Sequence, residues 1–253
     1  MSTTIYVTWD ATKKDPLENI IADEDPIFNL CIFDYSGHYG DNRELLSLSI
    51  KHGHSDHNYN LFSSTTHGKG EILNHIADND QSPESDYIGV FDDDILIRIS
   101  DLNRAILIGE SSGFASFQPS LARCSHFSHG FTVNQEGSIA RKVTWIEIMM
   151  PIMKRELLWA AKPFLERNVS AYGLDCFVFP ILALSEGISG DHAVIDASIA
   201  SHIKKVTPGN KVYRNGLTAR QEMHAMKDAC KKHLSAKGIA WEQHPNYQDI
   251  FKR

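Results

Sequence analysis

The stretch DYIGVFDDDILI, residues 86–97, is an apolar run interrupted by three consecutive aspartates. Its two apolar parts have the length and composition of buried strands. Asp92, Asp93 and Asp94 repel one another, so their arrangement is unfavourable unless a cation binds among them. The competing interpretation is an acidic turn at the surface, but such a turn rarely interrupts a core strand. We therefore expect a strand that presents these acids to a cation.

Carboxylate oxygens of this kind are preferred by Mg²⁺ and Mn²⁺, which usually keep several waters and bridge to the phosphates of a substrate. If the chain stays extended here, its side chains alternate between the two faces of the strand. Asp92 and Asp94 would then lie on one side and Asp93 on the other. The stretch thus predicts a metal and a phosphate-bearing substrate together.

Short apolar runs alternate with helical spacings on both sides of this stretch. In the N-terminal part we expect strands at residues 5–9, 28–35 and 45–50 and helices within 13–23 and 68–78. Farther on we expect a strand-like run at 142–152, an amphipathic helix at 153–168 kinked at Pro163, a strand and loop at 194–205, and a helix at 220–238 ending at Gly238. This rhythm predicts an α/β fold with a mostly parallel central sheet flanked by helices. Ligands bind such sheets at the carboxyl ends of the strands.

The composition is that of an ordinary globular protein, with 42% hydrophobic and 23% charged residues in 253. A net charge of −7 argues against a nucleic-acid partner, because no broad basic field would attract phosphates. The N-terminus does not resemble a signal peptide, and no apolar run approaches the roughly 20 residues that span a bilayer. Four scattered cysteines without a CxxC pair are typical of reduced thiols.

These features predict a cytoplasmic protein, with membrane association at most peripheral, at the inner face. The pair Lys204-Lys205 and the lysines of the 220–238 helix could face anionic lipid. A solvated helix face is the competing and favoured interpretation.

The stretch HGHSDH, residues 52–57, offers a different metal site. Three histidines and an aspartate at this spacing are typical of a zinc hydrolase of the metallo-β-lactamase type, and both side-chain types bind zinc. Such a site needs further histidines and a bridging acid downstream, and no matching element follows. The favoured interpretation is a solvated polar loop, and the zinc hydrolase stays an alternative.

Five blocks in order carry a resemblance to a known family: FDDDI (91–95), FQP (117–119), WIEIMMP (145–151), YGLD (172–175) and VIDASIASH (194–202). The first block looks like the DxD signature of nucleotide-sugar-dependent glycosyltransferases with the GT-A fold. The whole set resembles a bacterial and plant family of glycosyltransferase type, long known only as a domain of unknown function. The match spans roughly residues 86–205. It implies one GT-A-like domain over 1–253, with a nucleotide-binding half at about 1–95 and an acceptor-binding half and C-terminal helix at about 96–253.

The resemblance also implies roles on the donor side. Asp94 would bind the metal directly, Asp92 would contact the ribose or a metal-bound water, and His202 would be a late metal ligand. A lone histidine at a strand end is the competing interpretation of His202. The other donor-side candidates, which would contact the base, ribose or phosphates of the nucleotide, are Asp93, Thr8, Asp34, Tyr35 and Lys69.

Two acids are candidates for the catalytic base. Asp175 follows a glycine in YGLD, where it could take a proton from an acceptor hydroxyl, or could simply cap a helix. Glu147 lies in an apolar run, so its carboxyl group must face a cleft or find a partner. Trp145 beside it could stack on a sugar or be buried in the core.

The sequence as a whole predicts a metal-dependent glycosyltransferase, either a hexosyl- or a pentosyltransferase, of the kind that acts in polysaccharide biosynthesis. Mn²⁺ or Mg²⁺ would be its cofactor and a nucleoside diphosphate sugar its donor. A hydroxyl of a glycan or lipid-linked acceptor would receive the sugar. The alternatives are the zinc hydrolase and a non-catalytic domain that binds nucleotide or sugar.

Overall fold

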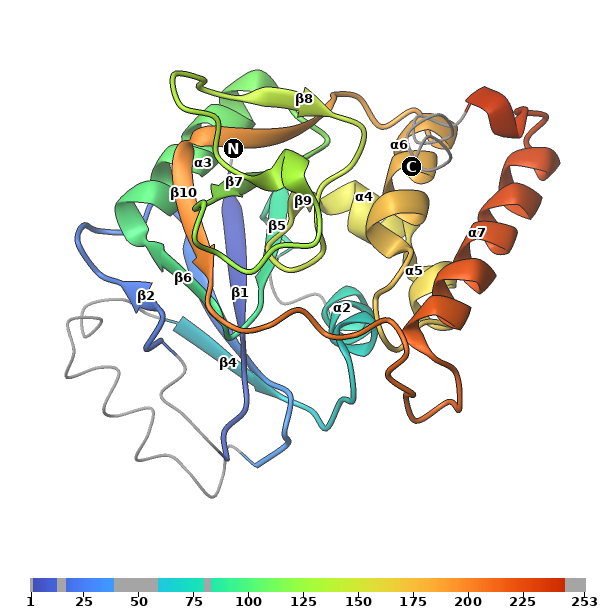
Figure 1. Cartoon of the computed structure of the whole chain (residues 1–253), viewed down its shortest axis with the longest axis horizontal. Helices are drawn as coiled ribbons and strands as arrows, with labels where there is room; N and C mark the ends of the chain where they lie inside the picture. The colour runs from blue at the N-terminus through green and yellow to red at the C-terminus, as the bar shows by residue number, and fades with distance from the viewer. Residues whose placement is uncertain (1, 13–16, 39–58, 80–82, 244–253) are drawn as a thin grey trace.

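A curled sheet of ten strands runs through the computed structural model, which describes residues 2–12, 17–38, 59–79 and 83–243 (Figure 1). The strand order is β2-β6-β10-β7-β9-β5-β1-β3-β4, and β8 pairs with β10 beside this path. The expected strand at 45–50 and the HGHSDH stretch lie outside the described residues.

The half of the sheet built from the first strands is parallel. In it, β1 (Thr3–Trp9) lies between β3 (Asn29–Asp34) and β5 (Tyr87–Phe91), and β4 (Tyr59–Ser63) pairs with β3. These strands are rich in buried β-branched and aromatic residues, which pack well on a pleated surface. Their carboxyl ends therefore meet along one edge of the sheet.

The other half of the sheet is mixed. The strands β7 (Ser116–Leu121) and β10 (His192–His202) are parallel, as are β2 (Ile20–Ile21) and β6 (Ile95–Arg98). The short strands β8 (Arg141–Val143) and β9 (Ile152–Lys154) are antiparallel to their neighbours, and so is β10 to β6. The mostly parallel pattern expected from the sequence thus describes the first half well and the second half in part.

Helices cover both faces of the sheet. On one face α3 (Ile99–Ser112) packs against Ile5, Val7 and Phe117, and on the other α2 (Lys69–Asp78) packs against Tyr6 and Val90. The second face also carries α4 (Arg155–Ala160), α5 (Lys162–Leu165), the short helical segment η4 (Leu174–Val178), α6 (Phe179–Ser185) and α7 (Ala219–Ala236). Two short 3₁₀ turns complete the described elements, η3 (Gly130–Thr132) and η5 (Trp241–Gln243). Successive side chains of β1 thus enter two separate cores: Ile5 and Val7 lie in one, and Tyr6 lies in the other.

Three local predictions need correction. The helix expected within 13–23 is wrong in its described part, because Ile20 and Ile21 form β2 and pair with β6. The run at 142–152 is a strand only at its two ends. The helix expected at 153–168 starts at Arg155 and breaks at Ala161, and Pro163 then lies in the first turn of α5.

The closing helix is confirmed. Thr218 caps the N-terminus of α7 in a capping box with Gln221, and Gly238 follows its C-terminus with a φ of 70°. In the described part of the chain, no helix combines the length and the apolar character that crossing a bilayer requires.

Candidate active site

A pocket of about 1170 Å³ opens at the carboxyl ends of β1, β5 and β10. Residues that line it come from the ends of these strands and from α2, η4 and α7. Nine of the ten candidate residues line it: Thr8, Tyr35, Lys69, Asp92, Asp93, Asp94, Glu147, Asp175 and His202. The tenth, Asp34, does not.

The three aspartates form a turn between β5 and β6, and the Ile95 N–H donates to the Asp92 carbonyl at 3.2 Å. The chain is therefore not extended here, and the expected alternation of Asp92 and Asp94 against Asp93 is wrong. A turn does interrupt the core strand, but it is not a surface turn, because all three aspartates line the pocket.

Cations from distant segments approach these acids. Lys69 of α2 lies 2.5 Å from Asp92, and Lys204, after β10, lies 3.2 Å from Asp93 and 3.7 Å from Asp94. Burial raises the pKa of Asp92, and the Lys69 ammonium group opposes this rise. The repulsion among the acids is thus reduced by residues that are far away in the sequence.

Asp94 faces His202 because β10 and β6 pair antiparallel with His202 opposite Ile95. The distance from Asp94 Oδ1 to His202 Nε2 is 3.4 Å. Burial alone would lower the pKa of His202, but the Asp94 carboxylate, the His126 carbonyl and the charge of Asp92 together outweigh it and raise that pKa. Burial would also raise the pKa of Asp94, but His202 and Lys204 outweigh this effect, and the pKa of Asp94 is lowered.

This pair suits a divalent cation. His202 Nδ1 lies 2.8 Å from the His126 carbonyl oxygen, so Nδ1 carries a proton and donates it to that oxygen. The other ring nitrogen, Nε2, faces Asp94. Asp94 Oδ1 is buried without a hydrogen-bond partner among the described residues. A cation could replace the proton on Nε2 and satisfy this oxygen. No cluster of three or more His, Cys, Asp or Glu ligands occurs in the described ranges, so waters or substrate oxygens would complete the coordination of Mg²⁺ or Mn²⁺.

Lys69 is held at the start of α2 by the two glycines around it. Its side chain is 9% exposed, and its ammonium group also donates to the Val90 carbonyl at 2.9 Å. A Cβ atom on Gly70 would lie 2.5 Å from the Asn168 carbonyl oxygen, so only glycine lets the helix start this close to residues 168–169. Gly68-Lys69-Gly70 is therefore a close packing point that aims a lysine into the pocket.

Thr8, Tyr35 and Asp34 lie at the ends of β1 and β3. Thr8 is buried at the pocket wall, and the Tyr35 hydroxyl donates to Asp93 at 3.2 Å. Burial raises the pKa of Tyr35. Asp34 is fully buried behind the wall and accepts hydrogen bonds from Ser36, from Ser63 at 2.7 Å and from the Ala11 N–H. The structure therefore places Asp34 where it shapes the loop that carries Tyr35.

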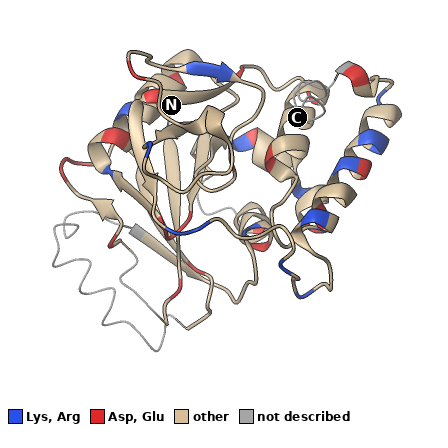
Figure 2. Ribbon diagram, in the orientation of Figure 1, with Lys and Arg blue, Asp and Glu red and all other residues tan. Residues whose placement is uncertain are grey.

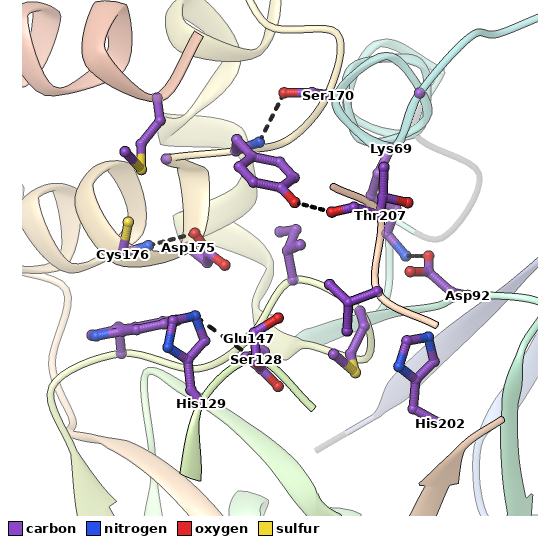
Figure 3. Close-up of a pocket in the computed structure, with 18 of the residues that line it drawn as sticks. Lys69, Asp92, Ser128, His129, Glu147, Ser170, Asp175, Cys176, His202 and Thr207 are labelled. Atoms are coloured by element: carbon purple, nitrogen blue, oxygen red, sulfur yellow. Dashed lines mark hydrogen bonds and ion pairs between the residues drawn. The ribbon is translucent and has the colours of Figure 1, made fainter. Parts of the chain in front are cut away.

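The two candidate bases, Glu147 and Asp175, line the side of the pocket away from Asp92 (Figure 3). Glu147 is 3% exposed, and burial, together with the charge of Asp175, raises its pKa to about 8. Its Oε1 lies 3.9 Å from His129 Nε2, and its Oε2 has no hydrogen-bond partner among the described residues. Its own backbone N–H donates to Gln118, a residue of the FQP block, at 2.6 Å.

Asp175 lies in the first turn of η4, which follows Gly173 at a φ of 86°. It does not cap a helix, since Gly173 has the N-cap position. Its Oδ1 accepts a hydrogen bond from the Cys176 N–H at 2.7 Å. Burial raises its pKa to about 6. The pocket thus contains two neighbouring acids, of which Asp175 ionises first.

An aromatic wall borders Glu147. The ring of Trp145 lies 4.6 Å from that of His129 and 4.9 Å from that of Phe131, both edge to face. His129, Phe131 and Lys204 were not foreseen as site residues. The histidine-rich loop CSHFSHG (124–130) was the available signal for His129, whereas nothing local marks Phe131 or Lys204.

No family model matches the chain, and no curated protein matches its sequence. Solved structures match its fold. TarS of S. aureus is 11% identical over 92% of this chain and 40% of its own, with a TM-score of 0.58. GalNAc-T7, solved with UDP, GalNAc and Mn²⁺, is 8% identical over 97% of this chain and 50% of its own, with a TM-score of 0.55. The fragment TarS 1-349, solved with UDP, is 11% identical over 93% of this chain and 72% of its own, with a TM-score of 0.52.

These neighbours define the class of the fold. They are GT-A-type glycosyltransferases, and the mixed α/β structure with its curled central sheet is a GT-A-like fold, as the sequence predicted. The chain spans half or less of the length of TarS and GalNAc-T7. The narrower family suggested by the five sequence blocks stays a prediction.

Proposed function

We propose that this chain is a metal-dependent glycosyltransferase that moves a sugar from a nucleoside diphosphate sugar to a hydroxyl group of a glycan or lipid-linked acceptor. One observation carries the proposal. A single pocket at the strand ends combines the Asp94–His202 pair and Lys69 on one side with the acids Glu147 and Asp175 on the other. The GT-A-like fold supports it, as do neighbours solved with UDP, with UDP-GlcNAc and with Mn²⁺.

The donor would bind along the aspartate turn. Thr8 and Tyr35 would contact the base or the ribose, and Lys69 would approach a phosphate. Asp94 and His202 would hold Mn²⁺ or Mg²⁺, with Asp92 close by. When bound, the cation would neutralise negative charge on the diphosphate. The burial of Lys69 strengthens its interaction with phosphate, because water screens it less.

The transfer step needs a group that accepts a proton. Asp175 would take the proton from the acceptor hydroxyl as that oxygen bonds to the anomeric carbon of the donor sugar. The bond from this carbon to the diphosphate oxygen breaks, and the nucleoside diphosphate leaves with the electron pair. A single displacement of this kind inverts the anomeric configuration.

The two pKa values favour Asp175 over Glu147 as the base. At neutral pH, Asp175 with a pKa of about 6 is mostly ionised, whereas Glu147 with a pKa of about 8 is mostly protonated. Glu147 would then hold a proton and donate a hydrogen bond to an acceptor oxygen. Trp145 and Phe131 would provide apolar surface for the acceptor sugar.

A thermal-shift experiment tests the donor site. UDP and other nucleoside diphosphates are added to the wild type, to Asp94→Asn and to Asp228→Asn, with Mn²⁺, Mg²⁺ or a chelator. Asp228 is an exposed acid of α7 outside the pocket and is the matched control. A nucleotide at about 100 times its Kd adds about 2.7 kcal/mol, which raises Tm by roughly 5 °C or more.

We expect one nucleotide to stabilise the wild type and Asp228→Asn only when Mn²⁺ or Mg²⁺ is present, and to lose this effect in Asp94→Asn. If no nucleotide stabilises the wild type with either metal, the proposal fails. The same measurement with Zn²⁺ on the wild type and on His54→Ala tests the alternative, and stabilisation by Zn²⁺ of the wild type alone would support the zinc hydrolase instead. Release of nucleoside diphosphate from the donor sugar separates an enzyme from a binding domain without catalysis.

A further inference from the structure

The first turn of α7 carries a carboxylate that is fully buried. Figure 2 shows acidic and basic residues along this helix, and Arg220, Asp228 and Lys231 among them are exposed. Glu222, by contrast, is 0% exposed, and it does not line the pocket. A buried carboxyl group is unfavourable unless hydrogen bonds replace the water that it loses. Glu222 must therefore find its hydrogen-bond partners within the protein.

These partners lie mainly in the loop before η4. Glu222 Oε1 accepts a hydrogen bond from the Val169 N–H at 3.0 Å, and Oε2 accepts one from the Ser170 N–H at 2.7 Å. The side-chain amide of Asn215 also donates to Oε1. Because Glu222 uses both of its oxygens, it fixes two consecutive peptide groups of the loop at once.

The same loop holds the start of α2, which carries Lys69. The Gly70 N–H donates to the Val169 carbonyl at 3.0 Å, so Val169 connects Glu222 with the residue next to Lys69. A Cβ atom on Gly68 would lie 2.2 Å from this carbonyl oxygen, so α2 and the loop are in close contact. A shift of Val169 would therefore move the backbone that carries Lys69.

The loop also leads into η4, which carries Asp175. Ala171, the residue after Ser170, has a left-handed backbone with a φ of 71°, which is unfavourable for a residue with a Cβ atom. Asn168 stabilises this turn, because its Oδ1 accepts a hydrogen bond from the Ala171 N–H at 2.6 Å. The Ala171 carbonyl in turn accepts from the Leu174 N–H at 3.1 Å. The turn thus sets where η4 begins and where Asp175 lies in the pocket (Figure 3).

We infer that Glu222 is a positioning residue, which aligns Lys69 with Asp175 through the loop of residues 168–171. The inference rests on the proposed function, because the roles of these two side chains belong to it. Transfer needs a fixed distance between the phosphate that leaves and the hydroxyl that attacks, since a misplacement of about 1 Å can cost about 10²-fold in rate. Glu222 contacts neither reacting group and acts on both sides of the pocket through the backbone.

Glu222→Gln tests the inference without leaving a cavity. The glutamine oxygen can accept from one of the two N–H groups, but its amide group meets the other N–H as a second donor. Glu222→Asp is measured beside it, in case glutamine prevents folding. It keeps the carboxylate but is one methylene shorter, so it reaches both N–H groups only if the loop shifts. Asn103→Ala is the control, because Asn103 of α3 is buried, accepts from the Ile27 N–H at 3.0 Å and does not line the pocket.

Amide hydrogen exchange, followed by NMR, reports both connections directly. The Gly70 N–H reports the contact between the loop and α2, and the Leu174 N–H reports the contact between the loop and η4. In the Glu222 variants, both should exchange roughly tenfold faster or more relative to the amides of β1, which exchange mainly through global unfolding. Asn103→Ala should leave this ratio unchanged. Unchanged relative exchange at either amide in the Glu222 variants overturns the inference.

Nucleotide affinity is the functional readout, which a merely structural role would not change. Calorimetry measures the binding of UDP, GDP, ADP and CDP with Mn²⁺. For the nucleotide that the wild type binds most tightly, we expect a loss of roughly tenfold in the Glu222 variants and none in Asn103→Ala. When Lys69→Met is already present, Glu222→Gln should cause no further loss, because its effect on the nucleotide passes through Lys69. An equal loss with and without Lys69 would contradict this.

The two proposals fail in different ways. If the wild type binds none of the four nucleotides, the proposed function is refuted, and this inference with it. If the wild type binds a nucleotide and the Glu222 variants bind it equally well, only this inference is refuted.

Discussion

Replacing Glu147 by glutamine should stabilise the protein, and increasingly so as the pH rises. Glu147 is 3% exposed, and burial raises its pKa from 4.5 to about 8. The folded chain therefore keeps this proton over a pH range in which the unfolded chain has already lost it. Below pH 4.5 both states bind the proton, and Glu147 costs no stability through its charge. Between the two pKa values the cost grows with pH, and above about 8 it stays constant.

The magnitude follows from the width of that range. Each pH unit between the two pKa values costs about 1.4 kcal/mol, so the whole range sets an upper limit of about 5 kcal/mol. The pocket is open to water, which screens the charge, and we expect about half of this limit, or about 2–3 kcal/mol. Glutamine has the shape of a protonated glutamate, so Glu147→Gln should remove the cost without leaving a cavity.

Urea denaturation at about pH 5, pH 7 and pH 9 measures this difference. We expect Glu147→Gln to match the wild type within about 1 kcal/mol at pH 5 and to exceed it by about 2–3 kcal/mol at pH 9. Glu136→Gln is the control, because Glu136 is exposed and its variant should follow the wild type at every pH. A difference between variant and wild type that does not change with pH, or a variant that is less stable at pH 9, would refute the reasoning.

Three further predictions concern the site and its frame. Asp175→Asn should reduce sugar transfer by roughly 10²–10⁴-fold while nucleotide binding persists, and the wild-type rate should rise through about pH 6 as Asp175 ionises; an unchanged rate in this variant would exclude it as the base. Lys69→Met leaves the Asp92 carboxylate without its ammonium partner and should cost about 1–3 kcal/mol in urea denaturation, less at low pH. The Lys162–Asp78 pair is more accessible to water, with side chains 34% and 44% exposed, so Lys162→Met should be nearly neutral. Gly109→Ala would push a methyl group into the Phe117 ring and should cost about 1–3 kcal/mol, while Gly130→Ala, whose added methyl group meets open space, should change Tm little; equal Tm values for the two would contradict the packing described here.

The elements that the sequence predicted best are those with one dominant local signal. The apolar runs on both sides of the aspartates are β5 and β6, and the periodic stretch with its final glycine is α7. The prediction failed where a pairing with a distant strand overrides a local signal. Residues 17–21 have helical spacing, yet Ile20 and Ile21 form β2, because pairing with β6 buries Ile20 in the core.

The sequence alone determined the α/β class, the order of the motif blocks and every acidic residue that lines the described pocket, since periodicity and strand ends are local properties. Only the tertiary structure decided which charges meet. The register of β10 on β6 sets His202 against Asp94, and the packing of α2 sets Lys69 against Asp92. The tertiary structure also gives Glu147 a higher pKa than Asp175, because the burial of a carboxyl group depends on which parts of the fold pack around it. Coulomb interactions and desolvation act through space, so no local pattern could have fixed them.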